Sequence, residues 1–237
     1  MHYQFRSLCR DKFSLIGSLA HTYGMDKVQK YISVHGLRNY TFLNTIEDGK
    51  DVEVPKTVDI YVHSKVLMVD DEVMICGSAN INDRSMLGDR DSEIALVIKE
   101  PPGSSTRKIA HFRRSLWAGY LGVSENDSTL TQPHVGCGCG NECVCTTAFK
   151  LWRDTSSENT RRYMVVWPSL PHSSIATFSQ INNVASLTPK SRIDARKHLN
   201  GVKGLVVDFP LNFLSKENLN VTGITSSTSL MDTSLWI

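Results

Sequence analysis

The sequence lacks long apolar runs and a strong net charge. Hydrophobic residues make up 41% of its 237 residues, yet no apolar run approaches the roughly 18 residues of a membrane-spanning helix. Residues 1–6 lack the apolar core of a secretory signal, so we expect a cytoplasmic protein that meets a membrane only peripherally. A net charge of +2 gives no reason to expect a nucleic-acid partner.

Cysteines are scarce outside one cluster. Four of the 6 cysteines crowd into residues 137–145, at Cys137, Cys139, Cys143 and Cys145. A cytoplasmic location argues against a disulfide framework. The two Cys-x-Cys pairs could hold zinc through four thiolates, but structural zinc sites space each pair by about two to four residues. The pattern therefore favours a Gly/Cys-rich loop, with zinc as the alternative.

The sequence contains one His-x-Lys pair, His63 and Lys65. Residues 58–69 are β-branched and apolar enough to predict one strand, in which alternate side chains point to the same face. His63 and Lys65 would then converge on one ligand atom. A single His-x-Lys sequence often occurs by chance, so the interpretation depends on the residues that follow it at fixed spacing.

These following residues suit a phosphate. A histidine can attack phosphorus or protonate a leaving oxygen, and Lys65 would stabilise the charge on the non-bridging oxygens. Ser78 and Asn80 offer a hydroxyl and an amide as further donors, and Gly77 allows a close backbone approach. We therefore predict a phosphodiester-cleaving site whose chemical step needs no metal and no other cofactor.

Two acidic residues complete the predicted site. Asp70 closes the pattern at the next turn, where we expect a scaffold residue that binds backbone. A catalytic histidine also needs an acidic group on its other ring nitrogen to orient it. Glu93, at the start of a neighbouring predicted strand, is the best candidate for this role.

The remaining sequence predicts an α/β fold. Helices are expected at 14–31, 106–121 and 149–166 (the last ending in a strand), and further strands at 31–34, 73–76 and 93–98. Polar residues around 44–56 predict a loop or hairpin tip, and the Ser/Thr/Asn-rich stretch 173–200 is expected to be mobile. The order of these elements indicates helices packed on a sheet.

The motif resembles that of the phospholipase D superfamily, His-x-Lys-x4-Asp-x6-Gly-Ser-x-Asn. Several blocks are similar to eukaryotic phosphatidylcholine-hydrolysing members, in the family's order: residues 31–38, 61–65, 77–88, 90–94, 209–214 and Trp236. The resemblance implies a phospholipase D-type α-β-α sandwich around a mixed sheet, with an irregular C-terminal extension.

The resemblance also implies an activity. The expected reaction is hydrolysis of phosphatidylcholine to phosphatidic acid and choline through a phosphohistidine, with an alcohol able to replace water. His63, in the second of the family's two motifs, is expected to act as acid and then base. Lys65, Gly77, Ser78 and Asn80 would bind the phosphate.

Family enzymes of this type build one site from two motifs, and this sequence carries only the second. We therefore expect a truncated C-terminal half, or a chain that pairs with another motif-bearing half or a second copy of itself. Residues 1–123 would form the catalytic half, 124–148 the Gly/Cys-rich loop and 149–237 the region completing the fold.

Two rival functions remain open. One is a homodimeric superfamily phosphodiesterase of the nuclease or cardiolipin type, and the other is a catalytically silent lipid-binding fragment. The expected substrate is a phospholipid at a membrane surface. Five basic residues could also meet an anionic phosphoinositide or simply form a solvated charged face: Lys190, Arg192, Arg196, Lys197 and Lys203.

Overall fold

The computed structural model describes residues 5–47, 49–102, 106–131, 147–185 and 192–219. The chain forms two compact units, one made of Met1–Ile32, Pro171–Ser186 and Pro210–Ile237, the other of Ser33–Leu170 and Leu187–Phe209. These units are defined by how the chain packs, whereas the segments 1–123, 124–148 and 149–237 were predicted from sequence composition. The division into those three segments therefore stays a prediction.

The first unit is helical where it is described. It contains the π-helical turn η1 (Arg6–Arg10) and helices α2 (Leu15–Tyr23), α3 (Met25–Tyr31) and α8 (Phe178–Ala185). The prediction that 14–31 is largely α-helical is confirmed, and Gly24, with a φ of 84° that favours glycine, divides the stretch into α2 and α3. The strand predicted at 31–34 is wrong, since α3 continues to Tyr31 and the next strand begins at His35.

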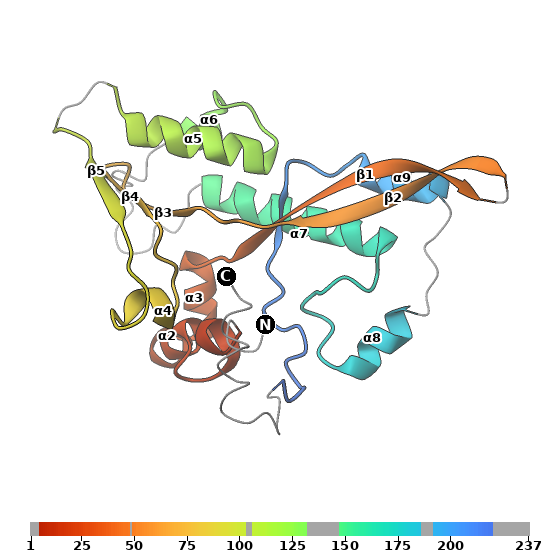
Figure 1. Cartoon of the computed structure of the whole chain (residues 1–237), viewed down its shortest axis with the longest axis horizontal. Coiled ribbons are helices and arrows are strands. Elements are labelled where there is room, and N and C mark those ends of the chain that lie inside the picture. Colours follow the sequence, from red (N-terminus) through yellow and green to blue (C-terminus); the bar gives the residue numbers. More distant parts are fainter. Residues whose placement is uncertain (1–4, 48, 103–105, 132–146, 186–191, 220–237) are drawn as a thin grey trace. The chain divides into compact units, whose positions relative to one another are not determined.

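The second unit contains a sheet with strand order β2-β1-β6, formed by β1 (His35–Glu47), β2 (Lys50–Ile60) and β6 (Val206–Asp208). β1 and β2 make a long antiparallel hairpin, visible across Figure 1. Of the two alternatives predicted for residues 44–56, a loop or a hairpin tip, the structure confirms the hairpin tip: Gly49 lies in the short connection at a φ of 71°, with strand on either side. β2 lies at the sheet edge, which explains why it tolerates Pro55.

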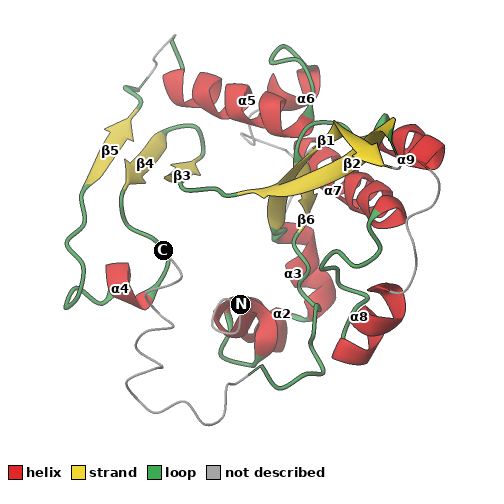
Figure 2. Ribbon diagram, turned by 45° about the vertical axis from the view of Figure 1, so that its right-hand side comes forward, coloured by secondary structure: helices red, strands yellow, loops and turns green. Residues whose placement is uncertain are grey.

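Helices α7 (Thr147–Val166) and α9 (Arg192–Leu199) pack with this sheet around a buried core (Figure 2). The core includes Tyr163 and Leu199. Asn159 links α7 to the segment that leads into β6. The Asn159 amide donates to the carbonyls of Lys203 and Val206 at 2.7 and 2.8 Å. The strand predicted at the end of 149–166 is wrong, and helices α8 and α9 occupy much of the stretch predicted to be mobile.

A second sheet, with order β3-β4-β5, holds the motif. It is formed by β3 (Lys65–Val69), β4 (Val73–Gly77) and β5 (Ala95–Lys99), and the same unit contains helices α4 (Asp83–Met86), α5 (Lys108–Leu121) and α6 (Ser128–Thr131). The predicted α/β class is confirmed. The described strands pair antiparallel throughout, in two sheets of three, where the prediction had one mixed sheet.

A buried ion pair joins this second sheet to α5. Arg113 donates to both carboxylate oxygens of Asp71, from Nε at 2.6 Å and from Nη2 at 2.8 Å. Its guanidinium also lies 4.6 Å from the ring centroid of Trp117. The hydrogen bond from Arg113 holds the pKa of Asp71 below its ordinary value. The pair therefore fixes the β3–β4 turn against the helix.

Within the described ranges, no helix combines the length and the apolar character needed to cross a bilayer. Among the same residues, no three His, Cys, Asp or Glu side chains gather as a metal site would require. The cysteine cluster at 137–145 lies outside the described residues, so its assignment to a loop or to zinc stays a prediction.

Candidate functional site

The register of the second sheet brings the motif together at one end. Lys65 pairs with Gly77 and Gly77 pairs with Ala95, so the start of β3, the end of β4 and the start of β5 form one row. Residues just outside this row lie next to one another in space. The end of the sheet therefore gathers six of the predicted site residues: His63, Lys65, Gly77, Ser78, Asn80 and Glu93.

His63 lies between two strands and not within one. β2 ends at Ile60 and β3 begins at Lys65, so the single strand predicted over 58–69 is wrong. β3 begins only at Lys65 because its partner strand β4 ends at Gly77, and the ladder cannot extend past the pair that these two residues form. The Lys65 side chain reaches back to His63, because its Nζ donates to the backbone carbonyl oxygen of His63 at 2.6 Å.

Glu93 binds serine and not His63. Its carboxylate accepts a hydrogen bond from the hydroxyl of Ser78. The hydrogen bonds from Ser78 and then Ser85, with a smaller contribution from the charge of Lys65, hold the pKa of Glu93 below its ordinary value of 4.5. The predicted orientation of His63 by Glu93 is absent from the described contacts, in which the ring of His63 instead meets that of Tyr61.

The single hydrogen of the Ser78 hydroxyl is already donated in this arrangement. The hydroxyl donates it to Glu93 and accepts from the backbone N–H of Ile94 at 3.0 Å. The predicted donation from Ser78 to a phosphate would require this network to rearrange. Gly77 has a packing role, because a Cβ there would come within 2.4 Å of the carbonyl oxygen of Ile94. Phosphate contacts by Gly77 and Asn80 stay predictions.

Removing the Ser78 hydroxyl is expected to raise the pKa of Glu93 towards its ordinary value of 4.5, since that hydrogen bond is the largest cause of the lowering. A carboxyl-detected NMR titration of the Ser78→Ala variant measures this shift. Ser92→Ala, which changes an exposed neighbour, is the matched control and is expected to leave the titration unchanged. An unchanged Glu93 titration in Ser78→Ala would contradict the described hydrogen bond.

Asp70 does not belong to the gathered site. It lies in the β3–β4 turn at the opposite end of the sheet. The five residues of β3 place it about 16 Å from Lys65, because a strand advances by about 3.3 Å per residue. Asp70 and Asp71 have φ values of 54° and 57°, a conformation that Asp tolerates better than most residues. Its inclusion among the catalytic residues stays a prediction, and its place in the turn agrees with the scaffold role.

Sequence reasoning assigned no role to several residues near the motif. Tyr61 precedes His63 by two positions, and its ring centroid lies 6.0 Å from that of His63. The Ser85 hydroxyl accepts from the backbone N–H of Asn80 at 3.1 Å. Arg84 and Asp91 close the loop before β5 with an ion pair of 2.9 Å. The spacing of Tyr61 and His63, two residues apart on the predicted strand, could have signalled their contact, whereas local spacing gives no signal for the other two, because each depends on how the loops fold back.

The predicted anionic-lipid surface is described only in part. Arg196 pairs with Glu53, and its guanidinium lies 4.4 Å from the ring centroid of Phe42. These contacts hold Arg196 against the β1–β2 hairpin. Lys190 lies outside the described residues, as does the side chain of Arg192, so a phosphoinositide contact stays a prediction.

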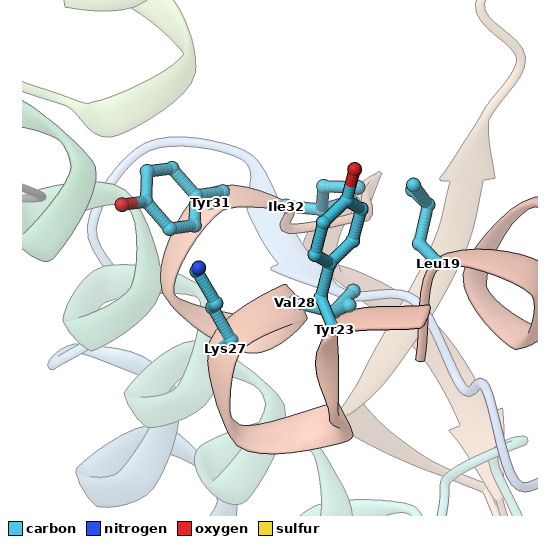
Figure 3. Close-up of a pocket in the computed structure, with 6 residues that line it drawn as sticks. All are labelled: Leu19, Tyr23, Lys27, Val28, Tyr31 and Ile32. Atoms are coloured by element: carbon cyan, nitrogen blue, oxygen red, sulfur yellow. The ribbon is translucent and has the colours of Figure 1, made fainter. Parts of the chain in front are cut away.

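A separate pocket of about 300 Å³ lies between α2 and α3 (Figure 3). Six residues line it, none of them from the motif: Leu19, Tyr23, Lys27, Val28, Tyr31 and Ile32. Figure 3 shows Tyr23, Lys27 and Tyr31 extending from the two helices around the opening. Its lining offers apolar surface and one ammonium group but no catalytic pair.

Comparison with known proteins agrees with the geometry of the motif end. A family model described as phospholipase D matches residues 41–181, more than half of the chain. The chain belongs to the phospholipase D family. The matched range includes the whole β3-β4-β5 sheet and every residue gathered at its motif end.

Individual phospholipases D are similar along almost the whole chain. Bovine phospholipase D2 is 31% identical over 249 residues, which cover 100% of this chain and 25% of the relative. Mouse phospholipase D1 is 34% identical over 236 residues, which cover 92% of this chain and 20% of the relative. Phospholipase D zeta 1 of Arabidopsis thaliana is 31% identical over 255 residues, covering 92% and 22%. The chain thus spans about a quarter or less of the length of these relatives.

Proposed function

We propose that this chain provides the second-motif half of a phospholipase D site that cleaves phosphatidylcholine to phosphatidic acid and choline. The observation that carries the proposal is the gathering of His63, Lys65, Ser78 and Glu93 at one end of the β3-β4-β5 sheet. Similarity to phospholipases D along almost the whole chain supports the same assignment.

The proposed chemistry proceeds in two displacements. A histidine of the first-motif half attacks phosphorus, and the bond from phosphorus to the choline oxygen breaks as protonated His63 gives that oxygen its proton. Neutral His63 then takes a proton from water, whose oxygen attacks phosphorus and releases the first histidine and phosphatidic acid. Lys65 stabilises the non-bridging oxygens in both steps. None of these steps needs a metal or other cofactor.

An exposed apolar row supports the need for a second half. Leu67, Ile75 and Val97 pair across the sheet and therefore share one face. Their exposed fractions are 56%, 36% and 59%. Contiguous apolar surface of this kind marks an interaction site. We propose that the first-motif half covers this face, at a membrane surface where the phospholipid substrate is met.

Complementation tests the proposal. The purified chain, the first-motif half of a related phospholipase D, and their mixture would each be given phosphatidylcholine vesicles and a primary alcohol. Phosphatidylalcohol is expected from the mixture alone, and light scattering would record the mass of each species. A folded mixture that forms a complex without product would overturn the proposal. Product from the chain alone would do so too, favouring the homodimeric alternative if the active species is a dimer.

A matched pair of variants tests the docking face. Leu67→Glu places a charge on the exposed row and is expected to weaken complementation strongly. Leu43→Glu is the control, because Leu43 is similarly exposed, at 50%, but lies on β1 of the other sheet. Equal effects of the two variants would show that the β3-β4-β5 face is not the docking surface.

A further inference from the structure

Tyr61 is an exposed aromatic residue beside the proposed acid. Its side chain is 70% exposed, in the segment between β2 and β3. The ring centroids of Tyr61 and His63 are 6.0 Å apart, and their planes meet at 38°. An apolar ring with this exposure, held next to the histidine, is available to a ligand that reaches His63.

The position of the leaving group follows from the proton transfer. A choline oxygen that takes the proton lies within about 3 Å of a His63 ring nitrogen. Two carbon atoms separate that oxygen from the trimethylammonium nitrogen, which places the cation within about 4 Å of the oxygen in its staggered conformers. With the ring centroids of Tyr61 and His63 6.0 Å apart, a leaving group that extends towards Tyr61 brings the cation inside the roughly 6 Å over which cation–π attraction acts.

A quaternary ammonium needs this kind of partner. It carries no N–H, so it cannot donate to a carboxylate or carbonyl, and aromatic faces are its usual binding groups in proteins. The charged groups close to the motif are already engaged: Glu93 accepts from Ser78, and Lys65 donates to the carbonyl of His63. A primary ammonium, by contrast, gains most from hydrogen-bond acceptors.

We propose that Tyr61 is a specificity-determining residue that binds the quaternary ammonium of the leaving alcohol through the face of its ring. The inference rests on the proposed function, because it assumes that His63 protonates the choline oxygen. It adds a residue whose effect falls on the choice of head group and not on the phosphate.

The test uses the assembled enzyme, meaning this chain in complex with the first-motif half. Three substrates would be compared by kcat/KM: phosphatidylcholine, phosphatidylethanolamine, and the 3,3-dimethylbutyl ester of phosphatidic acid, an uncharged isostere of the choline ester. Tyr61→Leu is expected to lower the preference for choline over the isostere by about 2- to 30-fold. Tyr61→Phe keeps the ring and is expected to leave that ratio within about twofold.

Controls separate this inference from the proposed function. Tyr23→Leu removes a tyrosine of α2 that is 57% exposed and is expected to change none of the ratios. An assembled enzyme that cleaves none of the three substrates overturns the proposed function itself. An active enzyme in which Tyr61→Leu slows all three substrates equally overturns the inference, since Tyr61 would then act only by packing against His63.

Discussion

Replacing His63 by asparagine in the assembled enzyme is expected to lower the turnover of phosphatidylcholine by roughly 10²- to 10⁴-fold, the usual contribution of a general acid–base group. Asparagine keeps a polar side chain of similar size but can neither give the choline oxygen a proton nor take one from water. Release of choline, followed by a coupled choline assay, measures the effect.

A substrate with a better leaving group distinguishes the role of His63. A p-nitrophenyl ester of phosphatidic acid needs no proton to leave, so the first displacement is expected to survive in His63→Asn. The second displacement still needs the base, and the variant should release one nitrophenolate per site and then stall. Absence of this burst would mean that His63 is the nucleophile, which would contradict the assigned acid–base role.

Replacing Asp71 by asparagine is expected to lower the free energy of unfolding of the chain by about 3–5 kcal/mol, because Arg113 would be left as a buried charge without its partner. Arg113 and Asp71 side chains are only 11% and 7% exposed. Chemical denaturation near neutral pH measures the difference. The double variant Asp71→Asn with Arg113→Met is expected to recover part of the loss, since it leaves no uncompensated charge.

The pH dependence of this effect has a definite sign. The folded-state pKa of Asp71 lies below its ordinary value of 3.8. The stabilisation is therefore complete above about pH 4 and is lost as the pH falls through the folded-state pKa, so the variant and the wild type should converge in acid. Asp154→Asn is the control, because its pair with Lys150 is 63% exposed on the Asp154 side, and little or no loss of stability is expected there. A similar loss from both variants would contradict the special role of the Asp71 pair.

The sequence predicted best those elements whose signal is local. Helix α5 was predicted at 106–121 and is observed at Lys108–Leu121, since its apolar stripe repeats at helical spacing. The strand predicted at 73–76 is β4, with one added residue. The apolar stripe of α5 and the continuous apolar run of β4 are both contained within the element itself, so each pattern leaves few alternatives.

The misses depend on partners that local patterns do not contain. Residues 58–69 look like one strand, but where β3 begins is decided by the length of β4, a separate element. The side chain of Glu93 was predicted to orient His63. Its carboxylate instead accepts a hydrogen bond from Ser78, because Ser78 and Ile94 meet across the end of the sheet. The motif therefore predicted which residues gather, while their hydrogen bonds required the tertiary structure.

The strand order β3-β4-β5 has a consequence for how the chain behaves in a cell or a test tube. β3 and β5 end the sheet, so each carries a row of backbone N–H and C=O groups without a strand partner among the described residues. Such edges, beside exposed apolar side chains, template pairing with other copies and lead to aggregation. We expect the chain produced alone to aggregate as its concentration rises, and co-expression with its complementary half to raise its soluble yield.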